Sequence, residues 1–438
     1  TVPAEKGNAR NLTNSPAWRE RDPVWSPDGK WIAYLSDRSG EYEVYIRPSD
    51  GEGNETRITT DGECFRYPLR WSPDSKKLLY ADSRFRYFYV DLDEKKPVQF
   101  DQDPWSHTPN EYGWSGDSNW ILYTKNNAGR TSSAYLYSLK DKSVRRVTPA
   151  EVNVLSPVFD REGKYLFYAA QRNFAPAFDE YDSGFIYEKS VRLFAVPLQK
   201  DGVSPLAPES DEEAIKEEKK EEAKAPDAGE KPADAAAKPA AEAAGADQAK
   251  KDEAKKEEKK DWVVDLDGIE ARAVCLPVPA GRYGALQAGE GMLFFMGFEP
   301  GGDGEDDGPG GGELKAYDLK KREAQGVIAG IMGYELSADG KKIGYAAPGN
   351  VWGIIDAKPG PNKPGSGKIN TADMRVKVDP AAEWKQIFNE AWRNERDFFY
   401  DPKLHGVDWN QMKERYGSLV PYCAHREDLN YLLGELIA

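Results

Sequence analysis

The chain has 438 residues, of which 31% are charged and 39% hydrophobic, and its formal net charge is −15 at pH 7. This length allows two or three domains. Because neutralising a phosphate backbone requires a basic surface, the charge argues against nucleic acid as a partner, and no apolar run approaches the roughly 18 residues that a membrane span requires.

A turn-and-strand motif recurs along the first part of the chain. "WSPDGKWIAYLSD" begins at Trp25, and close copies begin at Trp71 and Trp114. Looser copies begin near residues 157, 284 and 334, which makes six repeats. In each repeat Pro, Asp, Gly or Ser supplies turn chemistry, and β-branched and aromatic residues supply a strand. Self-similarity with a period of about 45 residues indicates a repeat architecture.

The strands within one repeat indicate β-propeller blades. After the first motif come a hairpin turn at Ser39-Gly40, a strand with Tyr42, Val44 and Ile46 on one face, and the short strand "TRITTDG". Four short strands per repeat is typical of a propeller blade. The segment "AEKGNARNLT" before the first repeat resembles the outer strands of a further blade. We therefore expect a mainly β fold with seven blades, and six as the alternative.

The fourth repeat continues into an aromatic-rich extension, Gln171 to Val196. Its aromatic residues exceed what one hairpin needs; they are Phe174, Phe178, Tyr181, Phe185 and Tyr187. One interpretation is packing against an adjacent domain. The other is a substrate path, because propeller loops commonly carry recognition. On the second interpretation, Arg172, Phe174 and Phe178 contact a peptide or a neighbouring subunit.

A low-complexity segment separates the fourth and fifth repeats. Residues 209–261 consist mainly of Glu, Asp, Lys, Ala and a few Pro, without an aromatic residue. Such a segment buries too little apolar surface to offset the entropy of ordering. We expect a disordered insertion in the fourth blade of a propeller that spans residues 1–370.

Two glycine-rich segments superficially suggest ligand sites. "GGDGEDDGPGGG", Gly301 to Gly312, lacks the alternating ligands and distal Glu of an EF-hand loop. "PGPNKPGSGK" places Ser366 where a phosphate-binding loop requires Lys. We interpret them as a hairpin loop and a connection between domains, and we expect no metal and no cofactor.

The pattern becomes helical after Asp379, which suits a helix N-cap, with Pro380 at the first helical position. Apolar residues then follow helical spacing up to Pro402, which predicts one helix. A second helix is expected from about Asp408 and a third near His425. We expect these to form a helical domain over residues 379–438 that is cut short.

Residues able to carry hydrolytic chemistry are few. Cys64, Cys275 and Cys423 are widely spaced and form no CxxC pair, so we expect free thiols. His107 lies in a loop before the third repeat, His405 lies in "LHGVDW", and no GxSxG motif accompanies them. We therefore assign no catalytic residue within this chain.

The repeats together with "EWKQIFNEAWRNERDFFYDPKLHGVDW" resemble tricorn protease and its bacterial homologues, which are serine peptidases of the C-terminal-processing type. The propeller motif is shared with TolB-like propellers, whereas the segment from Trp384 to Leu436 is more particular. The resemblance implies a second propeller followed by the start of a split catalytic region. It also implies that the catalytic Ser and His lie beyond Ala438, so this fragment alone is expected to be inactive.

The function implied by the resemblance is degradation of oligopeptides, with the propeller as a substrate channel or filter. The alternative is a non-catalytic, TolB-like propeller that serves as a binding scaffold. The resemblance also implies a homo-oligomer in the full-length form. The chain opens "TVPAEKGNARNLT", without an initiator Met or an apolar targeting region, like the interior of a longer protein. We expect a cytoplasmic protein, with the periplasm as the alternative.

Overall fold

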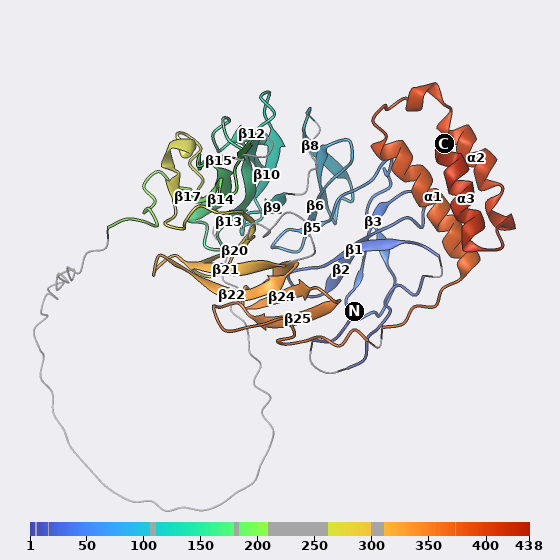
Figure 1. Cartoon of the computed structure of the whole chain (residues 1–438), viewed down its shortest axis with the longest axis horizontal. Helices are drawn as coiled ribbons and strands as arrows, with labels where there is room; N and C mark the ends of the chain where they lie inside the picture. The colour runs from blue at the N-terminus through green and yellow to red at the C-terminus, as the bar shows by residue number, and fades with distance from the viewer. Residues whose placement is uncertain are drawn as a thin grey trace, which may run out of the picture. The chain divides into compact units, whose positions relative to one another are not determined.

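The computed structural model describes residues 1–4, 7–15, 17–105, 111–178, 184–208, 262–298, 311–372 and 374–438 (Figure 1). The described residues of Thr1–Leu206 and those from Trp262 to Ala438 form one compact unit. The insertion expected over residues 209–261 and most of the glycine-rich segment at 301–312 lie outside the described residues.

Antiparallel sheets follow one another along the chain; five are four-stranded, the last is three-stranded, and one further pair of strands forms a separate hairpin. The first three comprise β1 (Glu20–Trp25), β2 (Trp31–Ser36), β3 (Glu43–Pro48) and β4 (Thr56–Arg57); β5 (Arg70–Trp71), β6 (Lys77–Ala81), β7 (Arg86–Asp91) and β8 (Pro97–Gln102); and β9 (Tyr112–Trp114), β10 (Trp120–Asn126), β11 (Ser132–Ser138) and β12 (Ser143–Arg146). Consecutive strands pair in antiparallel register; for example, Tyr34 of β2 stands opposite Tyr45 of β3.

The remaining sheets come from the second half of the propeller. They comprise β13 (Val154–Phe159), β14 (Tyr165–Gln171), β17 (Val191–Pro197) and β18 (Val274–Cys275); β19 (Tyr283–Ala288), β20 (Met292–Gly297), β21 (Gly312–Asp318) and β22 (Glu323–Ile331); and β23 (Gly333–Leu336), β24 (Lys342–Ala347) and β25 (Val351–Asp356). A separate hairpin pairs β15 (Ala177–Phe178) with β16 (Phe185–Ile186). The described residues therefore form a mainly β, six-bladed propeller.

The described residues form six blades, which is the alternative that the sequence allowed and not the favoured seven. The described residues before Glu20 contain no strand. Instead, Leu12 packs on Ile32, Tyr34 and Tyr45 of the first sheet, and its carbonyl accepts a hydrogen bond from Arg47. The segment "AEKGNARNLT" carries one large apolar side chain, so it has no alternating apolar face to bury as a strand.

The repeated motif is explained by one hydrogen-bonded turn. In the first copy the Ser26 hydroxyl donates to Asp28 and accepts from the Trp31 N–H at 2.9 Å. The Asp28 carboxylate in turn accepts from the Lys30 N–H at 3.1 Å. The same Ser–Asp arrangement recurs at Ser72, Ser115 and Ser337. These side chains satisfy turn N–H groups that would otherwise lack partners.

The fourth repeat places Asp160 where four of the other repeats have Ser. Its carboxylate accepts from the Lys164 N–H at 2.8 Å and the Tyr165 N–H at 3.1 Å, so the turn is preserved. Trp262 covers this turn so closely that a Cβ on Gly163 would lie 2.6 Å from its ring. Burial raises the pKa of the Asp160 carboxyl to about 6, although the N–H groups work in the opposite direction.

We expect Asp160→Ser to remove a pH dependence of stability. A carboxyl whose folded-state pKa is about 6, against 3.8 ordinarily, stabilises the fold below pH 3.8 and loses that contribution as pH rises through 6. The difference corresponds to about 2–3 kcal/mol. Urea denaturation at pH 4.5 and pH 7.5 should show a smaller difference in Asp160→Ser than in the wild type. Equal differences would contradict the assignment, and Asp339→Ser, at an exposed turn, is the control.

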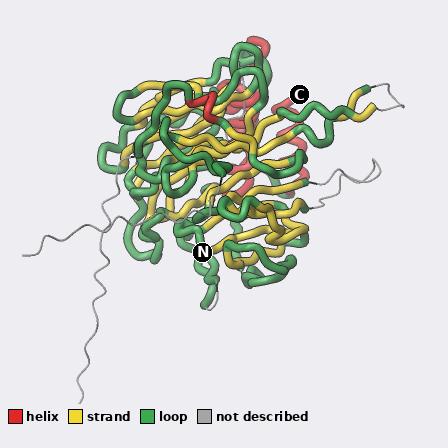
Figure 2. Tube along the Cα trace, turned by 90° about the vertical axis from the view of Figure 1, so that its left-hand side faces the viewer, coloured by secondary structure: helices red, strands yellow, loops and turns green. Residues whose placement is uncertain are grey.

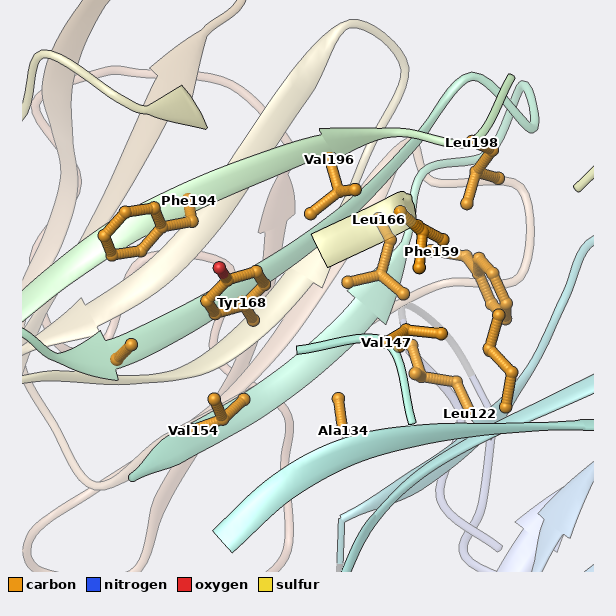
Figure 3. Packing of buried hydrophobic residues seen from close by; sticks show 13 residues of the cluster. Leu122, Ala134, Val147, Val154, Phe159, Leu166, Tyr168, Phe194, Val196 and Leu198 are labelled. Carbon is orange, nitrogen blue, oxygen red and sulfur yellow. The ribbon is translucent and has the colours of Figure 1, made fainter. Parts of the chain in front are cut away.

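Apolar cores join successive sheets. Figure 3 shows the cluster between the third and fourth sheets, in which Leu122 and Ala134 face Leu166 and Val196. Comparable clusters join the first sheet to the second, the second to the third, the fourth to the fifth and the fifth to the sixth. Among the described residues no such cluster joins the sixth sheet to the first. The cluster on that face of the first sheet contains only Leu12 besides its own residues.

Three helices follow the propeller, shown in red in Figures 1 and 2. They are α1 (Pro380–Phe398), α2 (Trp409–Gly417) and α3 (Arg426–Ile437). Short 3-10 turns, η2 (Leu404–Gly406) and η3 (Val420–Tyr422), lie between them, and a third, η1 (Ile269–Arg272), precedes β18. Asp379 caps α1, Asp408 caps α2 and His425 stands at the N-cap of α3, so the three predicted helix starts are confirmed. The division into domains at 370 and 379 stays a prediction. No helix in the described part of the chain is long and apolar enough to cross a membrane.

Candidate functional site

The sequence-predicted residues Arg172, Phe174 and Phe178 lie on the extension that follows β14. Phe174 is 82% exposed and Phe178 is 58% exposed. Phe178 stands opposite Phe185 on the β15–β16 hairpin with 5.8 Å between ring centroids, and Phe174 lies 5.8 Å from the Tyr187 ring. Tyr181 falls outside the described residues. The hairpin therefore brings these aromatic rings together outside the propeller core.

Arg172 is held differently from its neighbours. Its guanidinium lies 5.4 Å from the ring centroid of Phe194, a residue of the fourth sheet. A cation over an aromatic face is attracted by the ring quadrupole. Arg172 is thus anchored at the base of the extension, while the exposed rings form the kind of apolar patch that marks an interaction surface.

A second arrangement, which sequence reasoning missed, joins α1 to the first sheet. Arg393 lies 2.6 Å from the Asp37 carboxylate and 2.8 Å from the Glu390 carboxylate, and it donates to the Gly40 carbonyl at 2.8 Å. Arg393, Asp37 and Glu390 are each less than 8% exposed. We call these three residues the buried charge cluster. Burial works to lower the pKa of Arg393, but the bonds to Glu390 and Asp37 outweigh it and raise that pKa.

Neighbouring groups complete the cluster. The Tyr42 hydroxyl donates to Glu390 at 2.8 Å, and Arg19 binds the other Glu390 oxygen at 3.0 Å. Burial, together with the negative charge of Glu390, raises the pKa of Tyr42 and keeps it a donor. Gln386, one turn earlier on α1, donates to Asp37 at 3.3 Å. Both carboxylate oxygens of Asp37 and both of Glu390 therefore accept a hydrogen bond.

The contact extends along α1 to its last turn. Arg396 pairs with Glu41 at 2.6 Å, and the Phe398 ring lies edge-on to Phe65 at 5.2 Å. Phe65 in turn carries the Arg21 guanidinium 3.9 Å from its centroid. The helix is therefore oriented mainly by charges and hydrogen bonds, while its apolar face, including Trp392, packs against α2 and α3.

A signal for this contact exists in the sequence. Gln386, Glu390, Arg393 and Asp397 recur at helical spacing and form a polar stripe opposite the apolar one. Such a stripe is ordinarily solvated. Only the tertiary structure shows that it meets the hairpin of the first sheet, because the partners Asp37 and Gly40 lie about 350 residues away.

Two of the three histidines of the chain lie among the described residues. The His405 ring contacts the Tyr400 hydroxyl at an exposed turn, and the His425 N–H donates to Asp428 at 2.9 Å. His107 lies outside the described residues. The three cysteines are free thiols, as expected. Within the described residues no group of three or more His, Cys, Asp or Glu side chains could hold a metal ion.

Comparison with known proteins gives a consistent result along the chain. Residues 1–352 match the family model "Tricorn protease second beta propeller domain", and residues 380–438 match "Tricorn protease C1 domain". Tricorn protease homolog 1 of Streptomyces coelicolor is 26% identical over 99% of this chain and 39% of its own length. Tricorn protease of Thermoplasma volcanium is 23% identical over 94% of this chain and 37% of its own length.

A solved structure agrees with the fold. The crystal structure of the tricorn protease superposes with a TM-score of 0.75 and 18% identity, covering 95% of this chain and 37% of the other. The chain therefore spans well under half the length of each of these relatives.

Proposed function

Because the chain belongs to the tricorn protease family, we propose that it is part of a tricorn-like serine endopeptidase that degrades oligopeptides. The observation that carries this proposal is the consecutive match of the second propeller and the C1 domain over nearly the whole chain. The buried charge cluster supports it, because it orients the first C1 helix on the first blade of the propeller.

The catalytic chemistry would be acyl transfer, with a Ser nucleophile, a His base and backbone amides that stabilise the oxyanion. We propose that these groups come from sequence beyond Ala438, since the relatives are more than twice as long as the matched region. The propeller would act as a substrate channel or filter. Residues 1–438 alone would then bind peptides without hydrolysing them.

The β15–β16 extension is proposed to contact the substrate path or a neighbouring subunit. Its exposed rings have no structural task inside the propeller core. Homo-oligomerisation, the cytoplasmic location and the absence of nucleic-acid and membrane partners stay predictions.

The proposal is tested by comparing residues 1–438 with the natural full-length protein. The intact mass of the natural protein should exceed 48.9 kDa, and it should cleave a fluorogenic peptide in a manner blocked by serine-directed inhibitors. Residues 1–438 should show no turnover. A natural protein of 48.9 kDa without turnover would instead favour the non-catalytic, TolB-like scaffold.

The substrate-path assignment has its own variants. We expect Phe174→Ala with Phe178→Ala to reduce turnover or assembly in the full-length enzyme, while the stability of the propeller changes by less than about 0.5 kcal/mol, as for other exposed sites. Tyr422→Ala, at a residue that is 83% exposed in the helical region, is the matched control. Unchanged turnover and assembly in the double variant would refute the assignment.

A further inference from the structure

The turn between the first and second strands has the same length in every blade except the fifth. In the other five blades the residues that pair across this turn are seven positions apart, as Phe159 and Leu166 are in the fourth. In the fifth blade Ala288 stands opposite Leu293, only five positions later. The fifth turn is therefore two residues shorter, so it cannot supply every contact that a full-length turn makes with its neighbours.

Full-length turns of successive blades are joined by serine hydroxyls. The Asp28 N–H of the first turn donates to the Ser75 hydroxyl of the second at 3.1 Å, and the Asp74 N–H of the second donates to the Ser118 hydroxyl of the third at 3.1 Å. Ser75 and Ser118 have φ angles of 59° and 64°, in the left-handed region that favours glycine. The hydrogen bond to the preceding blade explains why a serine stands at each of these positions.

The third and fourth turns are joined by the Trp262 ring. A Cβ on Gly116 of the third turn or on Gly163 of the fourth would lie 2.6 Å from this ring. The Trp262 N–H donates to the Asp117 carboxylate at 2.8 Å, and its ring stands edge-on to Phe159 at 5.5 Å. Glycine at these two positions therefore leaves room for a side chain that fills the space between the turns.

Arg161 of the fourth turn makes the link past the short fifth turn. Its Nε donates to the Ala288 carbonyl of the fifth blade at 3.0 Å, and its terminal nitrogens donate to two carbonyls of the sixth turn, Ala338 at 2.6 Å and Ser337 at 3.0 Å. A Cβ on Gly340 would lie 2.8 Å from the guanidinium carbon. Although Arg161 is an exposed residue, each of its three nitrogens has a partner, so one side chain connects three blades.

The apolar cores between the sheets do not include Arg161. Separate clusters of buried residues join the fourth sheet to the fifth and the fifth to the sixth. Loss of the arginine should therefore free the fifth and sixth turns while the sheets stay packed. We propose that Arg161 is a brace that fixes the spacing of the fourth, fifth and sixth turns at one face of the propeller. The inference does not rest on the proposed peptidase function, because it concerns only the described blades.

The test is hydrogen–deuterium exchange, followed by mass spectrometry, on residues 1–438. The Gly289 N–H donates to Met292 and the Gly340 N–H donates to Ser337, so these two amides report on the fifth and sixth turns. We expect both to exchange about 10-fold faster in Arg161→Met, the equivalent of one hydrogen bond to a charged group. Arg161→Lys keeps the charge but lacks the planar fork, so its exchange should be intermediate.

Two controls separate the brace from a general effect on stability. Arg145→Met, at an exposed arginine of β12, should leave the exchange of both turns unchanged. Ser75→Ala should speed exchange at Asp28, whose N–H it leaves without an acceptor, and not at the fifth or sixth turn. In Arg161→Ala, added ethylguanidinium chloride should restore part of the protection of both turns, whereas the same concentration of sodium chloride should not.

Faster exchange in Arg161→Met that is confined to the fifth and sixth turns supports the brace. Unchanged exchange in these turns overturns it, and so does faster exchange throughout the propeller, which would show a general loss of stability. Should Arg161→Met fail to fold, Arg161→Lys decides: exchange equal to that of the wild type in both turns overturns the proposal, and faster exchange in these turns alone supports it.

Discussion

Arg393→Ala is expected to lower the free energy of unfolding by about 3–5 kcal/mol, because it leaves the buried Asp37 carboxylate without its cation and Glu390 with Arg19 alone. Asp37 is 7% exposed and Glu390 is 7% exposed, so water cannot readily replace the lost partner. The variant also loses the hydrogen bond to the Gly40 carbonyl. Urea denaturation followed by tryptophan fluorescence measures the change, and urea adds no salt that would screen the remaining charges.

The control is Arg84→Ala, at an exposed ion pair. The Arg84 side chain is 53% exposed and its partner Glu63 is 59% exposed, so we expect a loss of less than about 1 kcal/mol, as for surface pairs. In the double variant Asp37→Ala with Arg393→Ala the loss should be smaller than the sum of the two single losses, since no uncompensated charge remains at Asp37. An Arg393→Ala loss no larger than that of Arg84→Ala would contradict the role of the buried charge cluster.

Trp392→Ala is expected to destabilise the helical region by about 3–5 kcal/mol, as for other large-to-small changes of buried aromatic residues. Trp392 is 4% exposed and packs with Phe388, Leu429 and Leu432. Its indole N–H donates to the Trp409 carbonyl at 2.8 Å, and the Trp409 indole returns a bond to the Trp392 carbonyl at 2.9 Å. The variant therefore creates a cavity and removes one of two reciprocal bonds between α1 and α2.

Circular dichroism at 222 nm during urea denaturation reports this loss, because the signal at this wavelength follows the helix content. Tyr431→Ala, at a 71% exposed position of α3, should change the midpoint by less than the equivalent of 0.5 kcal/mol. A Trp392→Ala midpoint indistinguishable from that of Tyr431→Ala would show that the three helices do not share one core.

The sequence predicts the turns of the repeats and the helix starts, because the residues that form them are close together along the chain. The Ser–Asp turn found in four of the repeats is made by residues within five positions of one another, so the motif at Trp25 predicts both the turn and the strand that follows. The caps Asp379 and Asp408 act on N–H groups two or three residues later, and they were predicted for the same reason. The aromatic extension at Phe174 and Phe178 was likewise visible as an excess of large apolar residues over what a hairpin needs.

The errors and omissions arise where distant residues meet. The N-terminal segment resembled strands by composition, but with Leu12 as its only large apolar side chain it anchors on the first sheet and forms no further blade. The sequence by itself thus determined the propeller repeats, the helix starts and the family resemblance, since these depend on spacing along the chain. Only the tertiary structure decided that Arg393 is buried against Asp37. The burial and the pairing of a charge depend on which strands and helices pack together, and spacing along the chain does not encode that.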